Sequence, residues 1–256
     1  MRILQISPLF WNYWASVVYI LGSISYMFMD SFCLIFSVDN YASFVIYIIL
    51  ANLFVIDAIL YAIDWYTYAI LLRKHKNDLI NYRSELIACI FQHFGSYCYL
   101  LGAILALDKT KYMAKILILN IIGIFSLVLE AIFTIIGWQI SLRTSTYLSH
   151  KHFVHDIYFW GHTLNLTASL MYLLATILAG IFFRMKSIKY SLIVQLLQII
   201  GDIIYVVDSF VYMGCYMEDK RSIEENREKE SIKENISHQV YDNPGQELEP
   251  IVNNKK

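Results

Sequence analysis

Charged side chains are scarce in this chain of 256 residues. Asp, Glu, Lys and Arg together make up 16% of the sequence, whereas roughly 25% is usual in a soluble globular protein. Hydrophobic residues make up 58%. A domain of this size still needs a polar surface toward water, so the composition excludes an ordinary soluble fold. The formal net charge of −1 also excludes the strongly basic surface that nucleic-acid binding requires.

Proline and cysteine are sparse as well, and neither predicts a kinked helix or a covalent framework. The three prolines all fall outside the long apolar runs described below, so none of them bends a helix there. The four cysteines show no paired spacing, which argues against both a disulfide framework and a zinc site. They are Cys33, Cys89, Cys98 and Cys215.

Long apolar runs are what the sequence has in abundance. A helix needs about 20 mainly apolar residues to cross the hydrocarbon core of a bilayer. The runs are continuous, unlike the alternating ten-residue segments of a membrane barrel, and no Lys or Arg falls inside them. We therefore predict an all-α, multi-pass transmembrane bundle of six helices surrounded by lipid. The runs lie at about 10–29, 42–64, 86–107, 116–138, 163–183 and 191–214.

Residues 217–256 have a different composition, with many charges of both signs and no apolar core. Such a segment is expected to be disordered and solvated, although 218–234 could form a transient charged helix. We therefore divide the chain into a membrane domain, 1–216, and a charged tail that could bind a cytosolic partner. Lys and Arg are more numerous in the segments on the side of both termini, which predicts cytoplasmic N- and C-termini. The first run lacks signal-peptide features and is expected to be retained.

A small residue followed by a polar residue and a tyrosine recurs in the odd-numbered runs. The interval from Gly22 to Gly95 is the same as the interval from Gly95 to Ala168. A fixed period is typical of repeat architectures. The simplest interpretation is three tandem two-helix hairpins, at about 10–64, 86–138 and 163–214, and the alternative is chance similarity among Leu- and Ile-rich helices.

Two of the runs also share the pattern Gln-x-x-Gly-polar-x-x-Tyr, which begins at Gln92 in the third run and at Gln198 in the sixth. The hairpin pattern resembles the YrhK-like two-helix membrane domain. The resemblance implies successive membrane hairpins and no known activity. It is carried by Gly22-Ser23-Ile-Ser-Tyr26, Gly95-Ser96-Tyr-Cys-Tyr99 and Gly201-Asp202-Ile-Ile-Tyr205.

Polar residues within the runs recur at helical spacing, so each helix is expected to have one polar face. One interpretation is a packing seam, in which small residues allow close approach and polar side chains bond between helices at about 0.6 kcal/mol each. Such seams would support homo- or hetero-oligomers. The other interpretation is a polar lining around a path for an ion or a small polar solute.

Carboxylates inside the runs are the strongest candidates for function. A central Asp costs roughly 2.5–3.5 kcal/mol on insertion scales, and no Lys or Arg lies at a similar depth. Protonation, bonds from Tyr and Asn, or a bound cation could offset this cost, and intramembrane acids are functional hypotheses by default. Asp64 and Asp208, near the ends of their runs, could instead meet water. The candidate polar or ion site comprises Asp57, Glu130, Asp202, Asp208, Gln92, His93, Gln198 and Tyr205.

Histidines offer a weaker hypothesis. His150, His152 and His155 precede Asp156 in one short segment and could bind a transition metal, but the repeated His boxes of membrane di-iron oxidases are missing. A lone His93 is more typical of a hydrogen-bonded helix interface. No nucleophile elbow, zinc-protease motif or phosphate loop occurs.

The expected function is therefore non-enzymatic and needs no cofactor. We expect a structural, scaffolding or regulatory membrane protein that acts through helix–helix association. The alternative is a small cation- or proton-handling channel or transporter that uses its intramembrane carboxylates.

Overall fold

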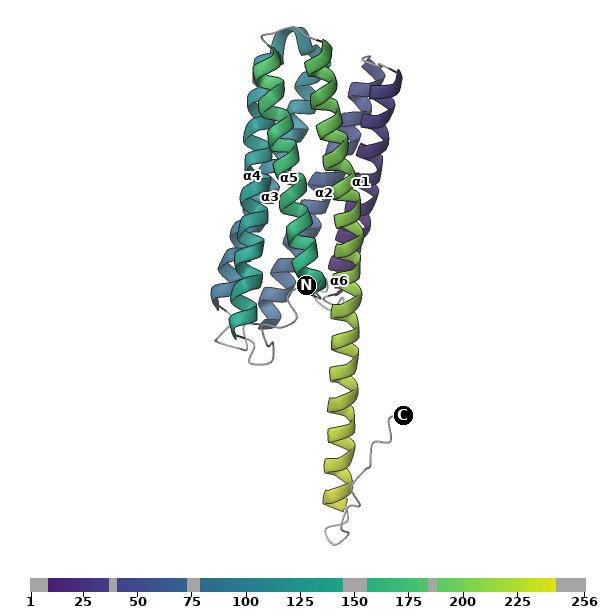
Figure 1. Ribbon diagram of the computed structural model, residues 1–256. Coiled ribbons are helices and arrows are strands. Elements are labelled where there is room, and N and C mark those ends of the chain that lie inside the picture. Colours follow the sequence, from purple (N-terminus) through teal and green to yellow (C-terminus); the bar gives the residue numbers. More distant parts are fainter. Residues whose placement is uncertain (1–8, 37–40, 73–78, 145–155, 184–187, 243–256) are drawn as a thin grey trace. The chain divides into compact units, whose positions relative to one another are not determined.

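The computed structural model describes residues 9–36, 41–72, 79–144, 156–183 and 188–242. Within these ranges every residue except Asp156 is helical, in agreement with the predicted all-α class. Figure 1 shows the helices, which run antiparallel in chain order. They are α1 (Leu9–Phe36), α2 (Tyr41–Leu72), α3 (Leu79–Leu105), the short η2 (Ala106–Asp108), α4 (Lys109–Thr144), α5 (Ile157–Phe183) and α6 (Ile188–Asp242).

Six of the described helices contain a stretch that is long and apolar enough to cross a membrane. The predicted number of spans among these residues is confirmed, and the result indicates an integral membrane protein. Each stretch extends beyond the apolar run that predicted it at one end or at both, while those of α5 and α6 fall one residue short at the other end. The stretches are Leu9–Phe36, Tyr41–Thr67, Arg83–Asp108, Lys111–Ile140, Ile157–Phe182 and Leu192–Arg221.

The chain forms two compact units, Met1–Tyr216 and Met217–Lys256, which we describe separately. In the second unit, α6 continues to Asp242, and Lys220 Nζ lies 4.0 Å from Glu224 Oε1. The predicted disorder of the tail is not confirmed for the helical residues. Residues 243–256 lie outside the described part of the chain.

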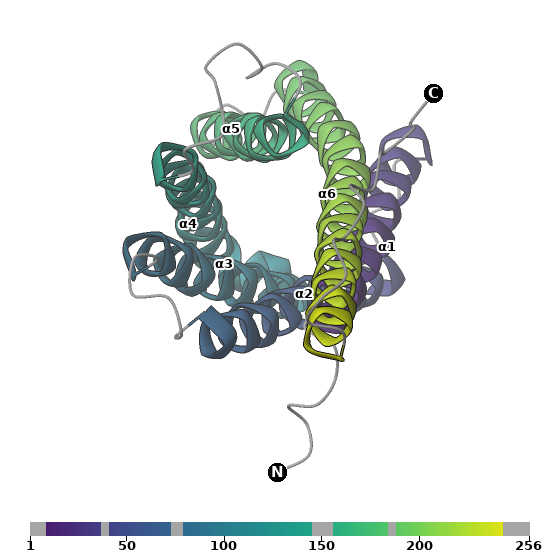
Figure 2. The same cartoon turned by 90° about the horizontal axis from the view of Figure 1, so that it is seen from below.

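In the first unit the helices follow one another around a common centre, as the end-on view in Figure 2 shows. Neighbours in sequence pack together from α1 to α5. The rings of Tyr13 on α1 and Tyr216 on α6 lie 5.4 Å apart, so the first and last helices also meet. The start of α1 and Tyr216 therefore lie at the same end of the bundle.

The distribution of polarity in this unit is inverted relative to a soluble protein. The exposed large side chains are mostly Ile, Leu and Phe, such as Phe28, Ile90 and Phe210. The most deeply buried side chains include Ser169, Ser209 and several acids. Because lipid cannot hydrogen-bond to polar groups, an arrangement with polar groups inside and apolar groups outside is expected in a bilayer.

Small residues allow α3 and α4 to approach closely. A Cβ atom added to Gly95 would lie 3.0 Å from the backbone oxygen of Gly123 and 2.8 Å from Leu127 Cδ2. Gly201 on α6 likewise faces the Tyr172 ring of α5, and a Cβ atom added to Gly201 would lie 2.7 Å from Cδ2 of that ring. These contacts follow the known use of small residues at membrane helix interfaces.

Tryptophan marks one end of the bundle. All five Trp residues of the chain lie near the start of α1 or α5 or near the end of α2 or α4. These helix ends adjoin one another: Trp138 on α4 stacks 5.8 Å from Phe159 on α5, and Asn12 on α1 donates to Asp64 on α2 at 3.5 Å. Tryptophan is enriched at membrane–water interfaces, which fits an interfacial position for this end.

Candidate functional site

A cavity of about 210 Å³ lies inside the first unit, and all six helices contribute to its wall. Seven tyrosines, three amide side chains and three serines line it, together with four acids. The volume is sufficient for several water molecules or a small organic molecule. The acids in the wall are Asp57, Asp64, Glu130 and Asp202.

Three buried acids on α2, α4 and α6 each accept a hydrogen bond from a neighbouring helix. Gln92 Nε2 donates to Asp57 Oδ2 at 3.1 Å. Asn165 Nδ2 donates to Glu130 Oε2 at 3.1 Å, and the Tyr19 hydroxyl donates to Asp208 Oδ2 at 2.7 Å. We refer to Asp57, Glu130 and Asp208 as the acidic ring.

The three donors of the acidic ring occupy equivalent positions in sequence. Tyr19, Gln92 and Asn165 are equally spaced along the chain, and the same interval separates Asp57 from Glu130. The bonds run from α3 to α2, from α5 to α4 and from α1 to α6. The first two bonds each join predicted hairpins that are adjacent in sequence, and the bond from Tyr19 joins the first predicted hairpin to the third.

A second acidic group surrounds Asp202. The Tyr172 hydroxyl donates to Asp202 Oδ1, and the Asp30 carboxyl lies next to Asp202. Asp30 in turn accepts a bond from the Tyr47 hydroxyl. The other oxygen of Asp202, Oδ2, is buried and has no hydrogen-bond partner among the described residues.

The cavity wall has acidic groups and no basic ones among the described residues. Asp57, Glu130 and Asp202 are 7%, 8% and 2% exposed, and within the described part of the chain no Lys, Arg or His lines the cavity. A buried carboxylate is costly unless it is hydrogen-bonded and balanced by a positive charge. The site is therefore suited chemically to protons or to a cation.

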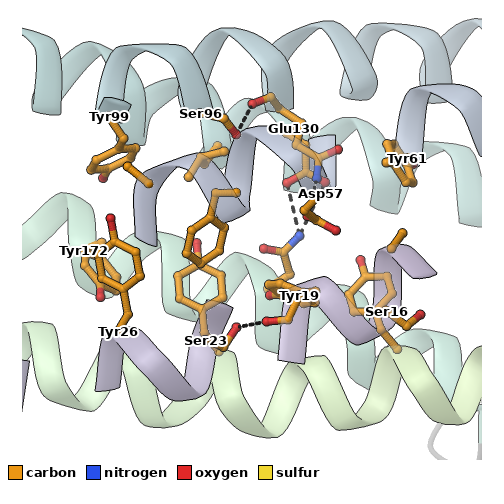
Figure 3. Close-up of a pocket in the computed structure, with 18 of the residues that line it drawn as sticks. Ser16, Tyr19, Ser23, Tyr26, Asp57, Tyr61, Ser96, Tyr99, Glu130 and Tyr172 are labelled. Carbon is orange, nitrogen blue, oxygen red and sulfur yellow. Dashed lines mark hydrogen bonds between the residues drawn. The ribbon is translucent and has the colours of Figure 1, made fainter. Parts of the chain in front are cut away.

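Tyrosine rings enclose the rest of the cavity. Figure 3 shows Tyr26, Tyr99 and Tyr172 gathered to one side of Asp57 and Glu130, with Tyr61 on the other side. The Tyr99 hydroxyl and Gln92 Oε1 are buried without a partner among the described residues. Aromatic faces attract cations, so the rings add to the preference set by the acids.

Five of the eight candidate residues line the cavity, and a sixth adjoins it. Asp57, Glu130, Asp202, Gln92 and Tyr205 lie in its wall. Asp208 is bonded to Tyr19, which lines the cavity. The alternative that Asp208 meets water is wrong, because its exposed fraction is 0%.

The structure does not bring the other two candidates to the site. His93 Nδ1 lies 2.9 Å from the Cys89 carbonyl of its own helix, and Gln198 is half-buried outside the cavity wall. The segment with His150, His152 and His155 lies outside the described residues. Elsewhere, across the described ranges, no three His, Cys, Asp or Glu side chains are grouped to hold a metal ion.

Most serines of the cavity wall do not form the bonds between helices that the packing-seam interpretation predicts. Ser16, Ser23 and Ser96 each donate to a carbonyl four residues earlier in their own helix, at 2.8–3.0 Å. Ser169 and Tyr205 do join two helices, through hydroxyls 2.8 Å apart. The polar contacts between helices are therefore made mostly by amides, tyrosines and acids.

Most of the tyrosines in the wall were not among the candidate residues. A signal for them existed in the sequence: Tyr19 and Tyr26 on α1, like Tyr205 and Tyr212 on α6, are seven residues apart, which places each pair on one helix face. The equal spacing of Tyr26, Tyr99 and Tyr172, at the period of the hairpins, is a second signal for the same surface.

Comparison of the chain with protein-family models, with curated proteins and with solved structures finds no match in any of the three. The geometry of the cavity is therefore the basis for inferring the function of this protein.

Proposed function

We propose that this protein handles cations or protons as a small channel or transporter, with the intramembrane cavity as its binding site. The observation that supports the proposal is the acidic cavity wall, in which the described residues include four acids and no basic side chain. A solute that crosses a bilayer through such a bundle needs a polar site away from lipid.

The cavity favours this hypothesis over a scaffolding role. A protein that associates through polar seams would be expected to present polar side chains on its outer surface. Here the buried polar groups face the centre of the first unit, and the outward faces carry mainly large apolar side chains. The role that we propose remains non-enzymatic and requires no cofactor.

We further propose that the bundle consists of three tandem hairpins, possessing the YrhK-like pattern noted above. This interpretation is supported by the equivalent donors Tyr19, Gln92 and Asn165 and by the three bonds that they make. It is also supported by burial at matching positions of the even helices, where Ala58, Ala131 and Ser209 are all fully buried.

Cytoplasmic N- and C-termini remain part of the proposal. The contact between Tyr13 and Tyr216 supports a common side for the two ends of the first unit. The choice of the cytoplasmic side depends on the distribution of Lys and Arg in sequence.

Flux measurements on purified protein in liposomes test the proposed function. Uptake of K⁺, of methylammonium and of protons would be compared for the wild type, Asp57→Asn and Glu130→Gln. We expect flux of at least one of these cations, reduced about tenfold or more by each substitution. Asp156→Asn is the matched control, because Asp156 accepts bonds from Trp138 and the Tyr158 backbone and does not line the cavity. Absence of both binding and flux for every cation would contradict the proposal and favour the scaffolding role.

A further inference from the structure

Two levels along the bundle are marked by Asp202 and by the acidic ring, and Asp64, the fourth acid of the wall, lies seven residues beyond Asp57 on α2. Asp202 and Asp208 are both on α6, six residues apart, which corresponds to about 9 Å along a helix axis. Asp208 shares its level with Asp57 and Glu130, because the three acids accept equivalent bonds from equivalent positions. Asp202 therefore lies about 9 Å along the bundle from the acidic ring.

The wall between these two levels is largely apolar and aromatic, and the hydroxyls of Ser23 and Ser96, which also line it, are bonded to carbonyls of their own helices. Phe54, Leu127 and Tyr205 line the cavity there, each three residues before the ring acid of its own helix. The rings of Tyr205 and Tyr172 lie 5.7 Å apart. A ligand that extends through this part of the cavity would have an apolar middle.

Each level also holds an acceptor that the protein leaves without a donor. At the ring level these acceptors are Gln92 Oε1, whose amide nitrogen is used by Asp57, and Asp208 Oδ1. At the other level it is Asp202 Oδ2, on a side chain that is only 2% exposed. An ammonium group has several hydrogen-bond donors and no acceptor, so it satisfies an acid and such an acceptor together.

A compact metal ion fits this arrangement poorly. Metal sites bring several oxygen ligands to within about 2.0–2.6 Å of one point, whereas in the described part of the chain the acids are not grouped in threes for a metal. The cavity volume of about 210 Å³ also exceeds the space that a bare ion requires.

We propose that the ligand is an elongated organic dication, an α,ω-diamine or short polyamine. One ammonium group binds at Asp57 and Glu130, the other binds at Asp202, and the hydrocarbon segment lies against the rings between them. The inference rests on the proposed function, since it names the class of cation that the same cavity holds.

Binding to the purified full-length protein in nanodiscs tests the inference. Affinities would be measured calorimetrically for butylamine, putrescine, 1,6-diaminohexane, 1,10-diaminodecane and K⁺. We expect a diamine of intermediate length to bind about tenfold or more tightly than butylamine, since the second ammonium adds a charge-assisted hydrogen bond. Equal affinity for butylamine and the diamines, or no optimum in length, would overturn the inference. If K⁺ or butylamine still bound, the proposed function would stand; if no cation bound, both would fail.

Substitution of Asp202 provides a second test. Asp202→Asn should lower the affinity for the best diamine about tenfold, with a much smaller change for butylamine, whereas Asp156→Asn should leave the preference for the diamine intact. An unchanged diamine affinity in Asp202→Asn would overturn the inference. Should this variant fail to fold, the length series on the wild type decides the question alone.

Discussion

Each acid of the acidic ring has one donor on a neighbouring helix. Substitution of that donor removes the hydrogen bond while the acid stays buried, so the contribution of the bond to stability can be measured. Gln92 is the most informative donor, because its amide nitrogen binds Asp57 and its oxygen is free to accept a ligand donor. Loss of a partner from a buried polar group costs about 1–3 kcal/mol in proteins generally. Bonds between membrane helices average about 0.6 kcal/mol, with a maximum near 1.7.

We predict that Gln92→Leu lowers the free energy of unfolding by about 1–2 kcal/mol, because Asp57 then loses its donor. Gln198→Leu is the matched control from the same sequence pattern, and it should stay within about 0.5 kcal/mol of the wild type. Unfolding in detergent, followed by tryptophan fluorescence, measures both. Equal destabilisation by the two substitutions would show that the bond to Asp57 contributes nothing specific.

Individual site residues could be predicted from the sequence where their residue type is rare in an apolar run. Asp57, Glu130 and Asp202 were identifiable because an acid in an apolar run is costly. Tyrosine is frequent in this chain, with 20 residues, and its amphipathic ring suits both an interface and an interior. Composition therefore could not show which tyrosines face the cavity, and only their spacing, within α1 and α6 and between Tyr26, Tyr99 and Tyr172, carried that information.

Among the helices, the close approach of α3 and α4 at Gly95 has a clear energetic consequence. An added methyl group there meets the Gly123 backbone oxygen at 3.0 Å and Leu127 at 2.8 Å. The backbone atom cannot move without displacing its helix. At Gly22 the nearest atoms belong to the Phe54 ring, at an ordinary 3.5 Å.

Gly95→Ala should therefore destabilise the protein by about 1–3 kcal/mol through overpacking. Gly22→Ala should be neutral or stabilising by up to about 1 kcal/mol, because alanine favours a helix over glycine. Thermal unfolding of the two variants under identical detergent conditions provides the comparison. Changes of the same sign and size would contradict the different packing of the two positions.

The number of long helices could be predicted from the number of long apolar runs, whereas the ends of the helices could not. A run of apolar residues ends at the first polar cluster, but a helix continues wherever its backbone bonds can form, as at Arg83 and beyond Tyr216. The helical part of the tail is rich in Glu, Lys and Arg, which are good helix formers. The prediction of a disordered tail considered charge and hydropathy, and it did not include the helix propensity of these residues.

At the scale of the molecule, the even number of membrane stretches among the described residues and the contact between Tyr13 and Tyr216 have a topological consequence. Reporters fused to the N- and C-termini should be accessible from the same side of the membrane. Protease protection in sealed vesicles measures this for both fusions, and alkaline extraction should leave the protein in the membrane fraction. Protection of one reporter and cleavage of the other would require an odd number of crossings.

The arrangement of the hairpins around a centre was beyond local sequence patterns. The constant period of the odd-numbered runs predicted similar hairpins, but it did not indicate that the last would contact the first. The pattern shared by Gln92 and Gln198 suggested that α3 and α6 correspond to each other, whereas in the structure Gln92 corresponds in role to Tyr19 and Asn165. Which residue acts as donor depends on how the helices close around the centre. That closure is made by contacts between residues that are far apart in the sequence.

The bond from Tyr19 to Asp208 joins residues that are 189 positions apart in the chain. At typical synthesis rates of about 5–20 residues per second, the ribosome delivers the second partner roughly 10–40 seconds after the first. Throughout this interval the nascent protein has one open edge, with a tyrosine hydroxyl whose acceptor has not yet been made. We therefore expect α1 to remain accessible to membrane insertion factors or chaperones until translation nears its end.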